Sequence, residues 1–247
     1  MNENDIVKAA EEYVLSIAPD PNRMLTQKGA DLARIDRSCD DRRDAVIRHV
    51  SENILPKYSA FDKGHNTDHA VSVINESCKL AEENGADLLM AFVVAAYHDL
   101  GLSVERERHH IFSAEILKKD ELINRLFTDK EIAIMAEAIE DHRASAENPP
   151  RSIYGRIVAE ADRQIIPESI LRRTIQYGLR REPDMDFEYH YKRAVSHLNE
   201  KYAEGGYMKL YLNSERNVKG LAELREIIAD EKRLKQILQQ IFNEEVQ

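Results

Sequence analysis

The chain has few cysteines, and the two that it has are isolated. Its 247 residues contain only Cys39 and Cys78, and their spacing is not that of a cysteine-based metal site. The pair fits reduced thiols in a cytoplasmic protein better than it fits a disulfide framework. The stability of the fold is therefore expected to come from its apolar core.

Long hydrophobic runs are missing as well. No apolar stretch approaches the ~20 residues that a membrane-spanning helix needs. The first segment, MNENDIVKAAEEYVLSIA, is acidic and amphipathic, so it lacks the basic region and apolar centre of a secretory signal. We therefore expect a cytoplasmic protein that has no membrane partner.

An excess of basic residues is also absent. The chain has 35 Lys and Arg against 45 Asp and Glu, a formal net charge of -10. Duplex nucleic acid is bound through clustered Lys and Arg, so it is not an expected partner. A small phosphorylated or nucleotide substrate remains compatible with this charge, because a metal centre and a few arginines can make one pocket positive.

Helical periodicity is present almost throughout the chain. It predicts a first helix around Ile6 to Ile17, which Pro19 ends, and a central helix at 88–100. The sequence LLMAFVVAAY in the central helix is apolar nearly all round, and its Ala, Leu and Met favour a helix over a buried strand. Further helices are expected at about 41–55, 66–83, 110–119, 129–142, 153–164, 167–179, 187–203 and 218–243. The fold class is all-α, and we expect one domain over 1–247 with its ligand-bearing part at about 60–180.

Several imidazoles and carboxylates fall at or near the ends of these helices. In chain order they are His69, His98, Asp99, His109, His142 and Asp162. This ligand set suits a borderline or hard divalent cation, and the shared Asp99 could join two ions. Each residue alone also has an ordinary interpretation, as a helix cap, a hydrogen-bonded core residue or a member of a surface ion pair. The metal hypothesis therefore depends on the whole set.

The segments around these residues resemble a known family. The stretches DHAVSVI, AAYHDLG and HHIFSAEIL, followed by His142 and Asp162, resemble the motifs of the HD-domain superfamily of metal-dependent phosphohydrolases. In the third motif of that family the His lies four residues before a small residue. Here the small residue is Ser113, which selects His109 over His110. The resemblance covers about 65–165 and implies an HD-domain-like helical bundle with additional helices at both ends.

The resemblance also implies a role for each matching residue. His69, His98, Asp99 and Asp162 would hold a first divalent metal, and His109 and His142 would hold a second one with Asp99 as the bridge. The metal could be Fe, Mn, Ni, Co, Zn or Mg, as one or two ions, and Asp99 and His98 are the expected catalytic residues. Contacts to the substrate are expected from His65, His110, Arg143 and Arg163, and other basic residues close to the ligands in sequence are Arg106, Arg108 and Lys63.

The function implied is hydrolysis of a phosphoester or nucleotide phosphate bond by metal-activated hydroxide. The chain lacks the GYP segment of the cyclic-di-GMP enzymes and has no Lys soon after the HD pair, so the natural substrate stays open. Two alternatives remain, a di-iron oxygenase of HD-like fold and a non-catalytic nucleotide or metal-binding protein. The apolar positions at 218–243 could also form an oligomer contact, so a homodimer is one expectation.

Overall fold

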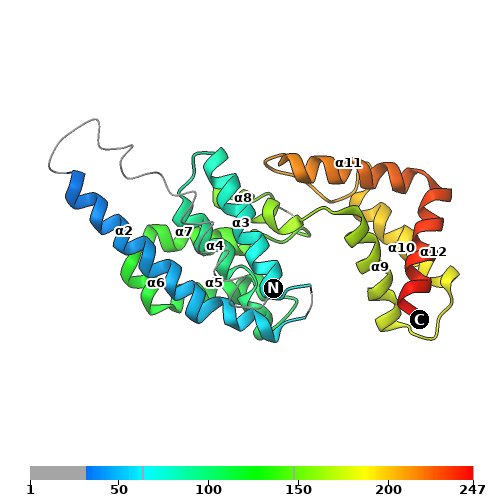
Figure 1. The fold of residues 1–247 in the computed structure, drawn as a ribbon, viewed down its shortest axis with the longest axis horizontal. Helices are drawn as coiled ribbons and strands as arrows, with labels where there is room; N and C mark the ends of the chain where they lie inside the picture. Colours follow the sequence, from blue (N-terminus) through cyan, green and yellow to red (C-terminus); the bar gives the residue numbers. More distant parts are fainter. Residues whose placement is uncertain (1–31, 63, 147, 247) are drawn as a thin grey trace. The chain divides into compact units, whose positions relative to one another are not determined.

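The protein is described from a computed structural model that gives residues 32–62, 64–146 and 148–246, with side chains from Asp41 onward. Every regular element within these ranges is a helix, which confirms the all-α prediction (Figure 1). None of the described helices is long and apolar enough to cross a membrane. The helix predicted around Ile6, the Cys39 side chain and Lys63 lie outside the described residues.

The backbone divides into two compact units, one ending at Asp162 and the other beginning at Arg163. All six candidate metal ligands lie in the first unit, whereas the expected ligand-bearing part, about 60–180, crosses the boundary. Compactness does not tell whether a unit folds alone, so the single-domain expectation stays a prediction.

The first unit is built around one apolar helix. The central helix α4 has every side chain from Met90 to Tyr97 buried, as its apolar sequence predicts. It packs against α3 and α7, and α5 packs against α7 (Figure 1). The α-helices of this unit are α2 (Leu32–His49), α3 (Thr67–Glu83), α4 (Leu88–Tyr97), α5 (His109–Lys119), α6 (Glu121–Leu126), α7 (Asp129–Glu140) and α8 (Ile153–Arg163), the last residue of which begins the second unit.

Side-chain caps fix where several of these helices begin. Asp87 accepts a hydrogen bond from the Met90 amide at 2.8 Å and so caps the start of α4. Asn66 caps α3 by accepting from the amide of His69. The short helix α6 was not predicted, and it forms because Asp120 accepts from two amides of its first turn. The caps therefore set the entry points of α3 and α4, two of the helices that bear candidate ligands.

The predicted helix at 41–55 differs from the structure at both ends. Helix α2 begins earlier, at Leu32, and is followed by a π turn over Val50–Ile54 and a 3-10 turn over Leu55–Ala60. Pro56 lies in the first turn of that 3-10 helix, where a backbone N–H has no helical acceptor to lose. The helical path therefore continues past Pro56, although the type of helix already changes at Val50.

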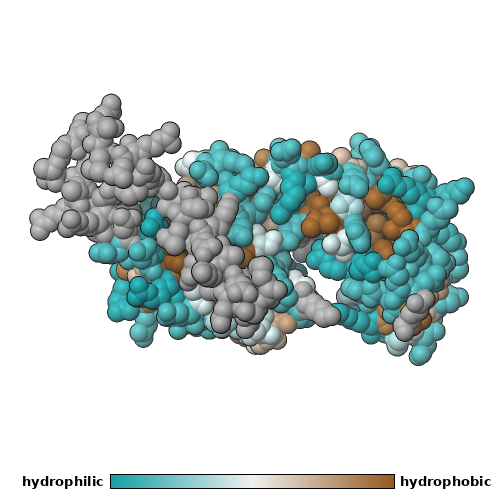
Figure 2. Space-filling view, viewed as in Figure 1, coloured by the Kyte–Doolittle hydropathy of each residue, from teal (hydrophilic) through white to brown (hydrophobic). Residues whose placement is uncertain are grey.

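The second unit consists of four packed helices in its described residues. Helix α9 contacts α10 and α12, and α11 contacts α10 and α12 (Figure 1). The helix predicted at 218–243 is two helices, because Asp230 accepts from the Arg233 amide at 3.0 Å and starts a new one. On the face shown in Figure 2, hydrophilic residues cover most of the described surface. The helices are α9 (Pro167–Arg181), α10 (Phe187–Tyr202), α11 (Glu215–Ala229) and α12 (Glu231–Val246).

Candidate metal centre

Helix ends bring the six predicted ligands together. His69 lies in the first turn of α3 and His109 is the first residue of α5. His98 and Asp99 directly follow α4, and His142 follows the C-cap of α7. Asp162 lies in the last turn of α8. Five segments that are far apart in sequence therefore contribute to one site.

The first cluster forms around one oxygen of Asp99. Its Oδ2 lies 3.7 Å from His69 Nε2 and 3.2 Å from His98 Nε2. Asp162 Oδ1 lies 3.2 Å from the same His69 nitrogen and 3.8 Å from that of His98. Two imidazoles and two carboxylates thus turn their ligand atoms to a common point.

The second cluster forms around the other oxygen of the same carboxylate. Asp99 Oδ1 lies 3.3 Å from His109 Nε2 and 3.6 Å from His142 Nε2, and the two Nε2 atoms are 3.1 Å apart. Asp99 is therefore shared between two groups of ligand atoms, each compact enough to hold a metal ion: one with His69 and His98, the other with His109 and His142. This is the arrangement that a bridging carboxylate requires.

Backbone carbonyls fix the orientation of three imidazole rings. Nδ1 of His98 lies 2.7 Å from Ala95 O, and Nδ1 of His142 lies 2.6 Å from Ile139 O. Nδ1 of His109 lies 2.7 Å from the carbonyl of Arg106. A carbonyl only accepts hydrogen bonds, so each Nδ1 carries a hydrogen, and whenever one of these rings is neutral its lone pair is at Nε2.

This donor set fits a divalent cation. Nε2 of His69 and Nε2 of His98 are buried and lack a hydrogen-bond partner within the described part of the chain. In the second cluster, the Nε2 atoms of His109 and His142 lie 3.1 Å apart, and the lone pairs that they carry in the neutral rings would be satisfied by a cation between them. Unpartnered polar atoms are costly inside a protein unless they bind something. The clustered His and Asp side chains could therefore hold metal ions.

The pKa shifts in the site show how strongly its groups interact. Burial alone would lower the pKa of His98, but the Asp99 charge raises it to about 9. Burial alone would raise the pKa of Asp99, but the charge of His98 holds it well below its usual range. Burial and the charge of His142 lower the pKa of His109 to about 4. A divalent cation would replace the proton of His98, because both compete for Nε2.

Three further residues position these ligands. A Cβ added to Gly101 would clash with the His109 carbonyl, so only glycine lets α5 approach closely enough to place His109 beside Asp99. The Gly101 amide donates to Ser113 Oγ at 2.8 Å. The buried Tyr58 hydroxyl donates to the carbonyl of Ala96 at 3.0 Å and accepts from the Asp99 amide at 3.3 Å. These contacts hold the turn that follows α4.

The residues predicted to contact the substrate differ in what they lie against. His65 lies beside the first cluster, with its ring centroid 5.8 Å from that of His69. The ring of His110 lies 5.7 Å from that of His109. Arg143 donates to the Glu107 carbonyl at 2.6 Å.

Arg163 is buried in the second unit, where its guanidinium lies 4.9 Å from the centre of the Tyr211 ring. The structure thus brings His65 and His110 next to ligands, and it places Arg163 against an aromatic ring instead. The substrate role of all four residues stays a prediction.

Sequence reasoning missed Tyr58 and Asp62. No local pattern marks Tyr58, since its importance arises from a contact with residues about forty positions away. Asp62 does have a local signal, because it stands three residues before His65 and accepts from its Nδ1 at 2.9 Å. An Asp close to a candidate histidine could therefore have been proposed from the sequence.

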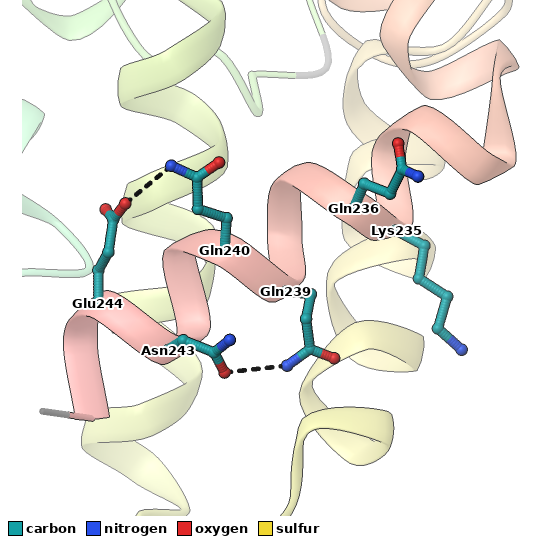
Figure 3. Close-up of a pocket in the computed structure, with 6 residues that line it drawn as sticks. All are labelled: Lys235, Gln236, Gln239, Gln240, Asn243 and Glu244. Carbon is teal, nitrogen blue, oxygen red and sulfur yellow. Dashed lines mark hydrogen bonds between the residues drawn. The ribbon is translucent and has the colours of Figure 1, made fainter.

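A separate hollow lies on the outer side of α12. Amide side chains dominate its lining, with hydrogen bonds from Gln240 to Glu244 at 2.9 Å and from Gln239 to Asn243 at 3.1 Å (Figure 3). All of its lining residues belong to one helix, and four of its polar side chains pair with each other. It contains none of the predicted site residues.

Comparison with known proteins supports the interpretation of the first unit. The family model described as HD domain matches residues 66–164, a segment that contains all six candidate ligands. The match confirms the resemblance that the motifs indicated. No curated protein matches the chain, and no solved structure matches it either.

Proposed function

We propose, on the premise that residues 66–164 are an HD domain, that this protein is a metal-dependent phosphohydrolase. The HD-domain superfamily commonly consists of such enzymes. The observation that carries the proposal is the shared carboxylate of Asp99, whose two oxygens face two separate pairs of imidazoles. The substrate would be a phosphoester or a nucleotide phosphate.

The chain's own residues define which atoms would hold the metals. His69, His98, Asp99 and Asp162 would form the first site, and Asp99, His109 and His142 the second. Imidazole and carboxylate ligands accept Fe, Mn, Ni, Co and Zn, and Mg suits the carboxylates. When bound, divalent cations lower the pKa of water and neutralise charge that builds up on phosphoryl oxygens.

The protein contributes rigidity and orientation to this chemistry. Asp99 is nearly fully buried, so its two oxygens fix the separation of the two sites. The carbonyls of Ala95, Arg106 and Ile139 keep three imidazoles aimed inward, so little reorganisation is needed when substrate binds. The side chain of Asp162 is the most exposed of the ligands, at 28%, so solvent reaches the first cluster at this residue.

The proposal is tested by metal analysis combined with an activity panel. The purified full chain is loaded in turn with Mn, Fe, Co or Ni and assayed with para-nitrophenyl phosphate, bis-para-nitrophenyl phosphate and nucleotides. We expect one or two ions per chain and release of the hydrolysis product. The variant Asp99→Asn should lose both the metal and the turnover.

Lys79→Gln is the matched control, because Lys79 forms an exposed ion pair with Glu83 at 3.8 Å on α3, away from the ligand atoms. Undiminished turnover in Asp99→Asn would refute the assigned site. Product release from no substrate with any metal would refute the hydrolase. Iron-dependent oxygen consumption without phosphate release would instead support the oxygenase alternative, since that chemistry uses the same ligand types.

A further inference from the structure

A second polar cluster lies beside the candidate metal centre. Asp62 accepts from His65 Nδ1 at 2.9 Å with its Oδ1, and from Arg106 Nη1 at 2.7 Å with its Oδ2. The Gly64 amide also donates to Oδ1, at 2.8 Å. Burial alone would raise the pKa of Asp62, but the hydrogen bonds from His65 and Arg106 hold it below its usual range. One ionised carboxylate therefore fixes two basic side chains that are far apart in sequence.

Each of these basic residues is next to one half of the metal centre. The His65 ring lies 5.8 Å from the ring of His69, a ligand of the first cluster. The Arg106 carbonyl receives the Nδ1 hydrogen bond of His109, a ligand of the second cluster. Asp62 thus joins two residues, His65 and Arg106, that each contact a different ligand cluster.

The cluster keeps unused capacity to donate hydrogen bonds. A guanidinium has five N–H donors, and within the described residues Asp62 is the only acceptor that the Arg106 guanidinium contacts. The Arg106 side chain is 67% exposed and that of Asp62 is 41% exposed. Exposed ion pairs contribute little to stability. The exposed and partly unused donors of Arg106 therefore suit the binding of an anion better than they suit stabilisation of the fold.

We propose that Arg106 and His65 bind a second phosphate group of the substrate and that Asp62 is the positioning residue that fixes the orientation of both side chains. This inference rests on the proposed phosphohydrolase function. The His65 ring lies beside the ligand His69, and the Arg106 guanidinium lies on the same Asp62 carboxylate as His65, so a phosphate that both contact would neighbour the phosphoryl group that would be cleaved. The substrate class is therefore a phosphoanhydride or another compound with neighbouring phosphates, in preference to a simple monoester.

The first test compares two substrates on the metal-loaded full chain. ADP carries two neighbouring phosphates, whereas para-nitrophenyl phosphate carries one. We expect Arg106→Gln and Asp62→Asn to raise KM for ADP roughly tenfold, since charge-assisted hydrogen bonds are lost, and to leave kcat/KM for para-nitrophenyl phosphate within about twofold. Arg106→Lys should recover part of the ADP affinity, because it keeps the charge but loses the fork.

The second test does not depend on turnover. Calorimetry measures the binding of inorganic pyrophosphate to Mn-loaded and to metal-free protein, with inorganic phosphate as the single-group comparison. Pyrophosphate should bind roughly tenfold more weakly to Arg106→Gln than to the parent chain, while phosphate binding changes little. Lys79→Gln serves as the control, since it removes a similar exposed ion pair on α3.

The two proposals fail in different ways. Pyrophosphate binding that depends on Arg106, in a protein that hydrolyses nothing, would support the anion site and remove the hydrolase function. Hydrolysis of ADP that is equally efficient in Arg106→Gln would overturn the anion site and leave the hydrolase intact. An equal loss on both substrates in Asp62→Asn would also overturn it, because the residue would then support the metal ligands in general.

Discussion

The buried polar side chains of the candidate metal centre differ from those of the second unit. In the second unit, buried polar side chains satisfy nearby backbone: Asn217 accepts from the Ile165 amide at 3.0 Å, and Thr174 donates to the Ile170 carbonyl at 2.7 Å. In the first unit, His98, Asp99 and His142 are equally buried but turn their ligand atoms toward one another. Buried polar groups that pair with the backbone stabilise a fold, whereas groups that converge on each other are suited to binding a ligand.

The two units also differ in net charge. Residues 163–247 contain 15 Lys and Arg and 14 Asp and Glu, so the acidic excess of the chain lies before Arg163. In the second unit, surface charges pair closely, as Arg172 does with Glu244 at 2.8 Å and Glu245 at 3.0 Å. The acidic first unit would gain from bound cations, because they reduce the repulsion between its carboxylates.

Metal binding should show the largest difference between the units. A divalent metal at about 100 times its Kd should stabilise the parent chain by about 2.7 kcal/mol, and thermal unfolding with and without Mn measures this. Asp99→Ala should abolish the metal-dependent shift and lower turnover by more than the 10- to 100-fold typical of residues that only support a ligand. Asn217→Ala should keep the shift. A shift that survives in Asp99→Ala would place the metal elsewhere.

Two glycines allow a matched comparison of packing. Gly101→Ala would place a Cβ against the His109 carbonyl, and Gly220→Ala would place one against the Ile165 carbonyl. Both substitutions overpack a helix contact and should destabilise the chain by about 1–3 kcal/mol in urea unfolding. Only Gly101→Ala should also weaken metal binding, because it moves His109 away from Asp99. Equal metal affinity in the two variants would show that α5 does not position the second cluster.

Removal of the buried Tyr58 hydroxyl tests whether it supports the turn after α4 that carries His98 and Asp99. Tyr58→Phe leaves the Ala96 carbonyl and the Asp99 amide without their partner, so we expect a loss of about 1–3 kcal/mol. Metal affinity should fall by roughly 10- to 100-fold. The measurements are urea unfolding and metal titration, with Thr174→Val in the second unit as the control for a lost buried hydroxyl. Unchanged metal affinity in Tyr58→Phe would restrict its hydroxyl to stability.

The smallest effect should come from Asp120, which caps α6 away from the metal ligands. Burial alone would raise its pKa, but the hydrogen bond from His49 and those from Ile123 and Tyr97 lower it. A lowered pKa in the folded state stabilises the chain above the unfolded-state value of about 3.9 and loses this contribution as the pH falls below it. Asp120→Asn should therefore be less stable by about 1 kcal/mol at pH 7.

The difference between Asp120→Asn and the parent chain should vanish as the pH drops below about 4. Urea unfolding at several pH values checks the prediction. A difference in the free energy of unfolding that stays constant down to low pH would mean that the negative charge of Asp120 does not contribute to stability.

Much of the candidate site was predictable because its residues are chemically unusual for their surroundings. His98 and Asp99 end the most apolar helix of the chain, and polar groups at such a place need partners. The resemblance then selected His109 over His110, and the structure places His109 beside Asp99. The helix boundaries at 41–55 and 218–243 were predicted less well, since Pro56 fits the first turn of a 3-10 helix and Asp230 accepts a local hydrogen bond, and periodicity shows neither effect.

The sequence by itself determined the helical class, the apolar centre of the first unit and the types of ligand atom available, because these depend on periodicity and side-chain chemistry. Only the tertiary structure decided that the two oxygens of Asp99 face different pairs of imidazoles. It also decided that Tyr58 supports this turn and that Asp62 connects His65 with Arg106. Such contacts join residues separated by many positions, and their geometry arises from how the helices pack, which no local pattern encodes.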